Sequence, residues 1–173
     1  IARRRILWLL ILVLANGLTT KVIAMNDQIL KEIVLLAAFI PLLIGTGGNV
    51  GAQSSTVVIR GLSTQKLKSL GAIKAVVKEA ITGALLGILM MIVVFPFAWW
   101  QGEGPLIASA VGISLISITT LAATAGAILP LLFDRMGLDP ALMSSPFITT
   151  VTDIAGVFIY LSTANWLLNS SIL

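Results

Sequence analysis

The sequence predicts an all-α protein that crosses the membrane with five helices in each subunit. Apolar residues make up 58% of its 173 residues and charged residues only 10%, and the mean hydropathy is +1.07. A soluble domain carries about a quarter charged residues. Five apolar segments reach the roughly 20 residues that one crossing needs. They are about 6–24, 33–59, 78–98, 105–133 and 146–168, and together they predict one transmembrane domain over 1–173.

The basic residues predict the orientation of these segments. Nine of the eleven precede the first segment or lie in the second and fourth connections: Arg3, Arg4, Arg5, Arg60, Lys66, Lys68, Lys74, Lys78 and Arg135. Lys and Arg favour the cytoplasmic side, so we expect a cytoplasmic N-terminus and, after five crossings, a C-terminus outside. The lysines suit contact with lipid headgroups. Because no aromatic residues are interleaved with them, nucleic-acid binding is not expected. Trp99, Trp100 and Trp166 mark the outer interface.

The connections and long segments give further expectations. Segments 33–59 and 105–133 exceed one straight crossing, so they should tilt, break or project beyond the bilayer. The stretch 60–78 predicts a short interfacial helix or a loop. The spacings Gly83-x-x-x-Gly87 and Ala122-x-x-x-Gly126 are typical of close helix packing.

The second segment is rich in glycine between residues 45 and 51, and Pro41 precedes this run. Glycine costs up to about 1 kcal/mol against alanine in a helix, which favours a break. Non-helical backbone at membrane depth must be buried or line a water-filled cavity, where its carbonyls can bind ions. Asn49 and Gln53, four residues apart, favour the cavity. The alternative is a tightly packed glycine-rich helix.

Asp153 lies within the fifth apolar segment with no basic residue within one helical turn. A carboxylate in hydrocarbon costs at least about 2.5 kcal/mol, so such a residue normally faces water or a cation. Ser144 and Ser145 before Pro146 predict the helix start there. Five residues share one face of this helix: Ser145, Thr149, Asp153, Gly156 and Tyr160. Their polar stripe leads from Ser145 to the acid. The alternative is a protonated Asp153 that hydrogen-bonds within the protein, for which Thr149 and Thr152 would suffice.

The available ligand atoms favour a hard cation. The chain has no Cys and no His, which excludes thiolate and imidazole ligands. One carboxylate with carbonyl and amide oxygens suits Mg²⁺ over Zn²⁺ or Cu⁺. A two-fold axis would add a second Asp153. Asp139, before Pro140, is either a turn residue or a peripheral cation site.

Two sequence runs resemble the MgtE family of magnesium channels and transporters. One is Gly-Thr-Gly-Gly-Asn-Val-Gly-Ala-Gln at 45–53, and the other extends from Asp139-Pro140 through Ser144-Ser145-Pro146 to Thr152-Asp153-Ile154-Ala155-Gly156. The resemblance covers essentially the whole chain. It implies a homodimer in the inner membrane, with a pore at the two-fold interface lined by the second and fifth helices.

The resemblance also implies roles for single residues. Asp153 would be the central acid of a Mg²⁺ site, Asn49 and the backbone around Gly45 would help hold the hydrated ion, and Thr149 and Ser145 would lie lower in the path. Gly48 and Asp139 are further candidates. The cytoplasmic CBS-domain sensor of many members has no counterpart in these 173 residues. A shortened chain and a member without the sensor are both open alternatives, so no gating by it is assigned.

Other functions remain open alternatives to a Mg²⁺ channel. A proton-coupled divalent cation carrier would use Asp153 as its titrating group. Transport of Mn²⁺, Co²⁺ or Ca²⁺ is not distinguished from that of Mg²⁺. An intramembrane protease needs two acids or a serine with a base, and the chain has one deep acid and no His, so we expect no enzyme. A non-conducting scaffold subunit would show no response to divalent cations.

Overall fold

The computed structural model describes residues 2–64 and 71–170, and this part of the chain consists of helices joined by short turns. The elements in order are α1 (Ala2–Met25), α2 (Asp27–Glu32), α3 (Val34–Ser63), α5 (Ala72–Ala98), the π-helix η1 (Trp99–Glu103), α6 (Gly104–Arg135) and α7 (Pro140–Ser170). The all-α prediction is confirmed for these residues.

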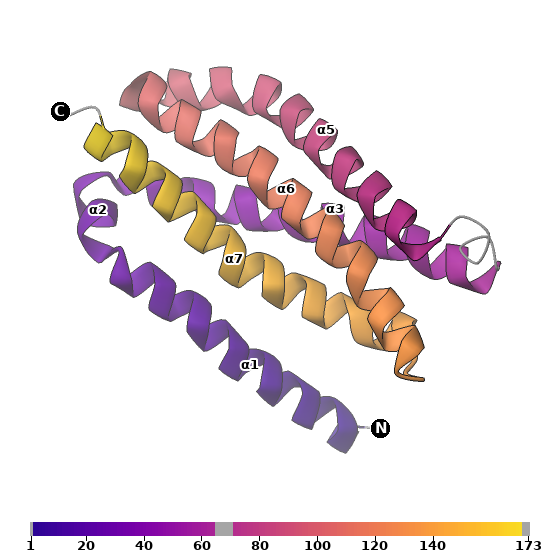
Figure 1. Ribbon diagram of the computed structural model, residues 1–173. Coiled ribbons are helices and arrows are strands. Elements are labelled where there is room, and N and C mark those ends of the chain that lie inside the picture. Colours follow the sequence, from indigo (N-terminus) through magenta and orange to yellow (C-terminus); the bar gives the residue numbers. More distant parts are fainter. Residues whose placement is uncertain (1, 65–70, 171–173) are drawn as a thin grey trace.

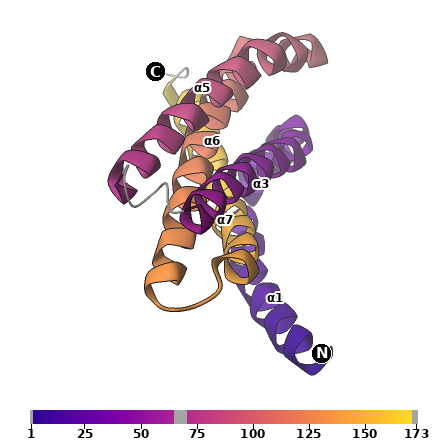
Figure 2. The ribbon, with the colours of Figure 1, turned by 90° about the vertical axis from the view of Figure 1, so that its right-hand side faces the viewer.

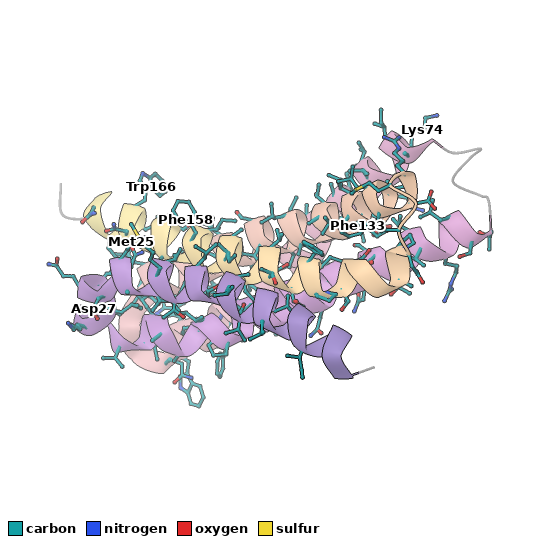
Figure 3. The ribbon with its side chains drawn as sticks, turned by 90° about the horizontal axis from the view of Figure 1, so that it is seen from below. Met25, Asp27, Lys74, Phe133, Phe158 and Trp166 are labelled. Atoms are coloured by element: carbon teal, nitrogen blue, oxygen red, sulfur yellow. The ribbon has the colours of Figure 1, made fainter. Side chains whose placement is uncertain are left out.

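The five long helices alternate in direction, so their ends gather at two opposite ends of the molecule (Figure 1). One end holds the start of α1, the end of α3, the start of α5 and the turn between α6 and α7. We call it the basic end, because Arg60, Lys74, Lys78 and Arg135 belong to it. The opposite end holds α2, η1 and the end of α7. Figure 3 shows Asp27 and Trp166 there, far from Lys74. This alternation matches the grouping of connections that the sequence predicts.

Helix α6 is the centre of the bundle, and it packs against α5, α3 and α7. Its residues Val111, Leu115 and Ile118 are fully buried and belong to one apolar core with Leu43 of α3 and Leu161 of α7. Figure 2 shows α3 crossing α6 and α7 at an angle. Helix α1 lies along α7, and the core sits between α3, α6 and α7 with the end of α5.

In the described part of the chain, four helices are long and apolar enough to cross a membrane. They are Val34–Ser63, Ala72–Gln101, Gly104–Arg135 and Ser144–Asn169. The apolar stretch found within α1, Leu12–Met25, is shorter than these four. Four of the five predicted spans therefore correspond to candidate membrane helices, and the crossing at 6–24 stays a prediction.

The predicted break in the second apolar segment is wrong, because α3 is one continuous α-helix of 30 residues with Pro41 inside it. At 1.5 Å per residue it is about 45 Å long, which exceeds the roughly 30 Å hydrocarbon core. Helix α6 is also continuous, over 32 residues with Pro130 inside it. The two long segments therefore do not break, which leaves tilt or projection beyond the bilayer.

Tertiary packing explains why the glycine-rich stretch stays helical. A Cβ atom at Gly47 would come 2.5 Å from Thr152 Cγ2, and one at Gly51 would come 2.5 Å from Ile148 Cγ2. A Cβ atom at Gly126 of α6 would clash with the carbonyl oxygen of Gly51. Because these glycines have no side chain, the three helices approach closely, and this packing offsets the low helix propensity of glycine. At these positions the alternative of a tightly packed glycine-rich helix was the correct one.

The small-residue spacing in α5 has the predicted packing role. Gly83 and Gly87 are buried against α6, where a Cβ at Gly83 would contact Ala123 and the carbonyl of Thr119. Gly87 faces Thr119 and the backbone of Ile116 in the same way.

Two predicted boundaries need correction. Helix α5 begins at Ala72, so 72–78 belongs to the membrane helix and not to a separate interfacial element, while 65–70 lie outside the described residues. Helix α7 begins at Pro140, six residues before the predicted start at Pro146, which is inside the helix. The preceding turn is closed by Leu138 N–H to Phe133 O at 2.9 Å and Gly137 N–H to Asp134 O at 3.1 Å. Gly137 has φ 71°, a conformation that glycine adopts without strain.

Matched glycine substitutions test the close approach of α3 and α6. Gly126→Ala adds a methyl group against the backbone of Gly51, and we expect it to lower the free energy of unfolding by about 1–3 kcal/mol. Gly48→Ala is the control, because nothing lies within 4 Å of its Cβ position. It should leave stability unchanged or raise it by up to about 1 kcal/mol. Thermal unfolding in detergent measures both, and equal effects of the two substitutions would contradict the packing.

Candidate functional site

Asp153 lies near the middle of α7 and is half-buried in the single chain. Among the described residues its carboxylate has no hydrogen bond and no ion pair. The hydroxyl of Thr149 instead donates to the backbone carbonyls of Pro146 at 3.0 Å and Ser145 at 3.4 Å. The Oγ1 atom of Thr152 is buried without a partner. Within the described part of the chain, the alternative in which these threonines satisfy Asp153 therefore does not occur.

The glycine contacts fix how α3 and α7 run past each other. Gly47 faces Thr152, and one turn along α3 Gly51 faces Ile148. The two helices are antiparallel, so residues of α3 and α7 whose numbers sum to about 199 stand at the same height.

This register places predicted site residues of both helices at one level. Gly45 and Asn49 on α3 bracket the height of Asp153, and Thr149 stands opposite Asn49 within one residue. In the described residues no hydrogen bond joins Asn49 to Asp153, so the two groups share a level without touching. The four residues therefore lie within about one and a half helical turns of one another along the helix axes.

The predicted site residues lie on surfaces that the single chain leaves uncovered. Gly45, Asn49, Thr149 and Ser145 are exposed, and Gly48 is half-exposed. Nothing lies within 4 Å of a Cβ position at Gly45 or Gly48, in contrast to Gly47 and Gly51. We define the polar face of the chain by its exposed or half-exposed members from the two helices: Gly45, Asn49, Gln53 and Thr56 of α3, and Ser145, Thr149 and Asp153 of α7. The four glycines between residues 45 and 51 thus divide into two packing positions and two open positions.

A pocket of about 400 Å³ lies where the polar face reaches the basic end. Ala52, Ser55, Thr56, Ile59 and Arg60 of α3 and Ala141 and Ser145 of α7 line it. Because both helices contribute, their exposed sides open toward the same space. In the sequence, Arg60 indicates only the orientation of the chain. Its position four residues after Thr56 and seven after Gln53 could have indicated that it continues their helical face.

The α7 stripe ends differently from the prediction. Beyond Asp153, Gly156 is buried against the side chain of Ile118, and Tyr160 is fully buried. The predicted face of five residues is therefore exposed only from Ser145 to Asp153. In a single chain the open part of α7 runs from the basic end to the acid and stops there.

Asp139 lies apart from this site. It is 14 residues before Asp153 on α7, which corresponds to roughly 21 Å along the axis at 1.5 Å per residue. Its Oδ1 atom accepts a hydrogen bond from the backbone N–H of Ala141 at 2.9 Å, so it caps α7. Asp139 also lines a neighbouring pocket of about 580 Å³ with Asp134 and Arg135. The capping bond agrees with the turn interpretation of this residue.

One copy of the chain supplies one carboxylate at the level of Asp153. Within the described residues no three acidic side chains come together as a metal-binding group. The other oxygen donors at this level are the neutral side chains of Asn49 and Thr149 and the exposed backbone of Gly45. A helical carbonyl oxygen has a second lone pair that can accept from a hydrated ion. This set can bind a hydrated hard cation but neutralises only one positive charge.

Comparison with known proteins finds the same similarity over most of the chain. The sequence profile of the MgtE family, described as divalent cation transporter, matches residues 40–163. The magnesium transporter MgtE of Thermus thermophilus is 39% identical over 166 residues, which cover 96% of this chain and 37% of that protein. The proteins of the same name from Enterococcus faecalis and Bacillus subtilis are 36% and 32% identical over 95% and 98% of this chain. The chain thus spans somewhat more than a third of the length of these relatives.

The start of α7 gives a direct test of the Asp139 cap. Asp139→Ala removes the acceptor for the Ala141 N–H, and we expect a loss of about 0.5–2 kcal/mol in the free energy of unfolding. Asp139→Asn keeps an acceptor oxygen and should stay close to the parent. Ser145→Ala serves as the control, since Ser145 lies inside the helix and caps nothing. Chemical unfolding followed by circular dichroism measures the three variants. A larger loss for Ser145→Ala than for Asp139→Ala would contradict this helix start.

Proposed function

Because the chain belongs to the MgtE family of divalent cation transporters, we propose that two copies of it form a channel for hydrated Mg²⁺ lined by α3 and α7. The single observation that carries the proposal is the position of Asp153. Its carboxylate has no counter-charge among the described residues and stands level with Asn49 on a face that the single chain leaves open. In a membrane such a group needs water, a cation or a partner.

The chemistry of the polar face supports passage of a hydrated ion. Its side chains are amides, hydroxyls and one carboxylate, which are hard oxygen donors. Mg²⁺ sheds its water reluctantly and is usually held through several waters by one or two carboxylates. Open space beside Gly45 and Gly48 leaves room for a hydration shell next to α3. Asn49, Thr149, Ser145 and the Gly45 backbone would bind the ion through its waters. Mn²⁺, Co²⁺ and Ca²⁺ share these preferences in part.

A two-fold dimer is proposed because one chain leaves the site incomplete. Two symmetric copies would bring two Asp153 carboxylates to one path and balance both charges of the ion. They would also cover the polar face, which is unsuited to acyl chains. The other exposed surfaces differ, since α5 presents Ile81, Leu85 and Ile92, which fit lipid.

The orientation proposed from the sequence fits the arrangement of the helix ends. We infer that the basic end lies in the cytoplasm, since Lys and Arg are enriched on that side. With a fifth crossing by α1, the C-terminal end of α7 would lie outside the plasma membrane. The pocket between Thr56 and Ser145 would then be the cytoplasmic mouth of the path.

A proton-coupled divalent cation carrier is the second candidate. It is favoured by the fact that Asp153 is the one titratable group on the polar face. A carrier would accumulate Mg²⁺ in liposomes in response to a pH gradient alone. A channel would instead give a current that reverses at the Mg²⁺ equilibrium potential at any pH difference.

Replacing Asp153 tests the function. Asp153→Asn and Asp153→Ala remove the negative charge, and because a charge-assisted contact is lost, we expect Mg²⁺ flux into liposomes to fall at least about tenfold. Asp27→Asn is the matched control. It removes a carboxylate that pairs with Lys31 at the opposite end, so flux should be unchanged. Full flux in both Asp153 variants would disprove the proposal.

Thermal stability gives a test that needs no flux. Binding of Mg²⁺ to the folded dimer should raise its stability by about 1.4 kcal/mol at ten times the dissociation constant. We expect the melting temperature to rise with Mg²⁺ in the parent and to lose this dependence in Asp153→Asn. Choline chloride at equal ionic strength is the control for screening. A scaffold subunit without a cation site would show the same response in both proteins.

A further inference from the structure

Among the residues whose side chains the structure describes, Arg60 supplies the positive charge that lines the pocket at the polar face. It follows Asn49, Gln53 and Thr56 on α3 at spacings that keep all four on one side of the helix. Its exposed side chain lines the 400 Å³ pocket with Thr56 on its own helix and Ser145 on α7. A guanidinium therefore stands at the mouth of a face that is otherwise neutral down to Asp153.

The charge of Arg60 is not balanced within the described residues. No carboxylate lies within ion-pair distance of it there, and Asp139 lines the adjacent pocket and not this one. Arginine stays protonated at every physiological pH. The pocket mouth therefore holds a permanent positive charge in each copy of the chain.

We propose that the charge of Arg60 is an electrostatic barrier to Mg²⁺ that enters the path from the basic end. The path therefore conducts Mg²⁺ better toward that end than away from it. This inference rests on the channel function proposed above. A unit positive charge about 8 Å from a divalent cation in salt-free water lowers the local ion concentration about sixfold. For ions that approach from the basic end, this lower local concentration reduces the rate of entry into the path. Ions that approach from the opposite end reach Asp153 before they meet this charge.

The salt dependence of the barrier follows from its exposure. Arg60 is open to solvent, so salt screens its field over about 8 Å at physiological ionic strength and over about 3 Å at 1 M. The asymmetry should therefore be largest in dilute buffer and disappear in concentrated monovalent salt. A barrier caused by the shape of the pocket would persist in salt.

The absence of cysteine in this chain allows a test in which the charge at position 60 is changed on the folded protein. In planar bilayers, Arg60→Cys should increase Mg²⁺ current away from the basic end about threefold in dilute salt, with little change in the opposite direction. A methanethiosulfonate reagent then joins its thioalkyl group to the introduced thiol as a disulfide and releases methanesulfinate. The trimethylammonium reagent should restore the low current, and the sulfonate reagent should raise it further. The side on which the reagent acts also identifies the basic end.

Lys74→Cys is the matched control. It removes the same charge at the same end (Figure 3), from a groove on α5 lined by Ile73, Lys74, Val77, Lys78, Ile81 and Thr82 and not from the polar face. It should change the ratio of the two currents much less than Arg60→Cys does, since Lys74 does not line the pocket at the polar face.

The outcomes separate this inference from the function beneath it. Equal effects of Arg60→Cys and Lys74→Cys, or an unchanged current ratio in Arg60→Cys, would overturn the barrier while loss of flux in Asp153→Asn upholds the channel. Loss of all current in a stably folded Arg60→Cys that the positive reagent does not restore would also overturn it. Arg60→Lys keeps the charge and should behave as the parent. Full Mg²⁺ flux in Asp153→Asn would contradict the proposed channel function itself.

Discussion

The close approach of α3 to α6 and α7 at Gly47, Gly51 and Gly126 is the constraint on which the rest of the structure depends. Side chains of Thr152, Ile148 and Ile118 and the backbone of Ala122 occupy the space that Cβ atoms would fill. This packing keeps a glycine-rich segment helical, and it fixes the height of α3 against α7. As a result Gly45, Asn49, Thr149 and Asp153 stand at one level while the outer side of α3 stays uncovered.

That uncovered side raises an energetic problem in a bilayer. Asn49, Gln53 and Asp153 are polar groups at the depth of apolar helices, and hydrocarbon offers them no partners. The outer side of α5, with Leu85 and Ile92, meets no such difficulty. Two surfaces of one chain therefore require different surroundings, one lipid and the other water or a second protein surface. A symmetric dimer around a wet path meets both requirements with the same chain.

The sequence was a good guide to features that depend on local pattern. Hydropathy predicted α3, α5, α6 and α7 as membrane helices, and the isolation of Asp153 predicted a group without an internal counter-charge. It could not predict that Gly47 and Gly51 pack while Gly45 and Gly48 stay open, because that depends on which residues of α6 and α7 lie opposite. For the same reason the predicted helix break failed. The start of α7 was misplaced because Ser145-Pro146 and Asp139-Pro140 carry similar start signals, and the turn at Gly137 decides between them.

Burial of Gly156 and Tyr160 was likewise beyond a helical-wheel argument, since Ile118 of another helix packs against Gly156.

The most direct test of the dimeric path is an experimental structure of the chain in a lipid nanodisc at millimolar Mg²⁺. Two Asp153 carboxylates facing one hydrated ion across a two-fold axis, with Asn49 of both copies beside its waters, is the predicted result. An Asp153 that faces acyl chains, or a chain whose polar face meets no second copy, would contradict it.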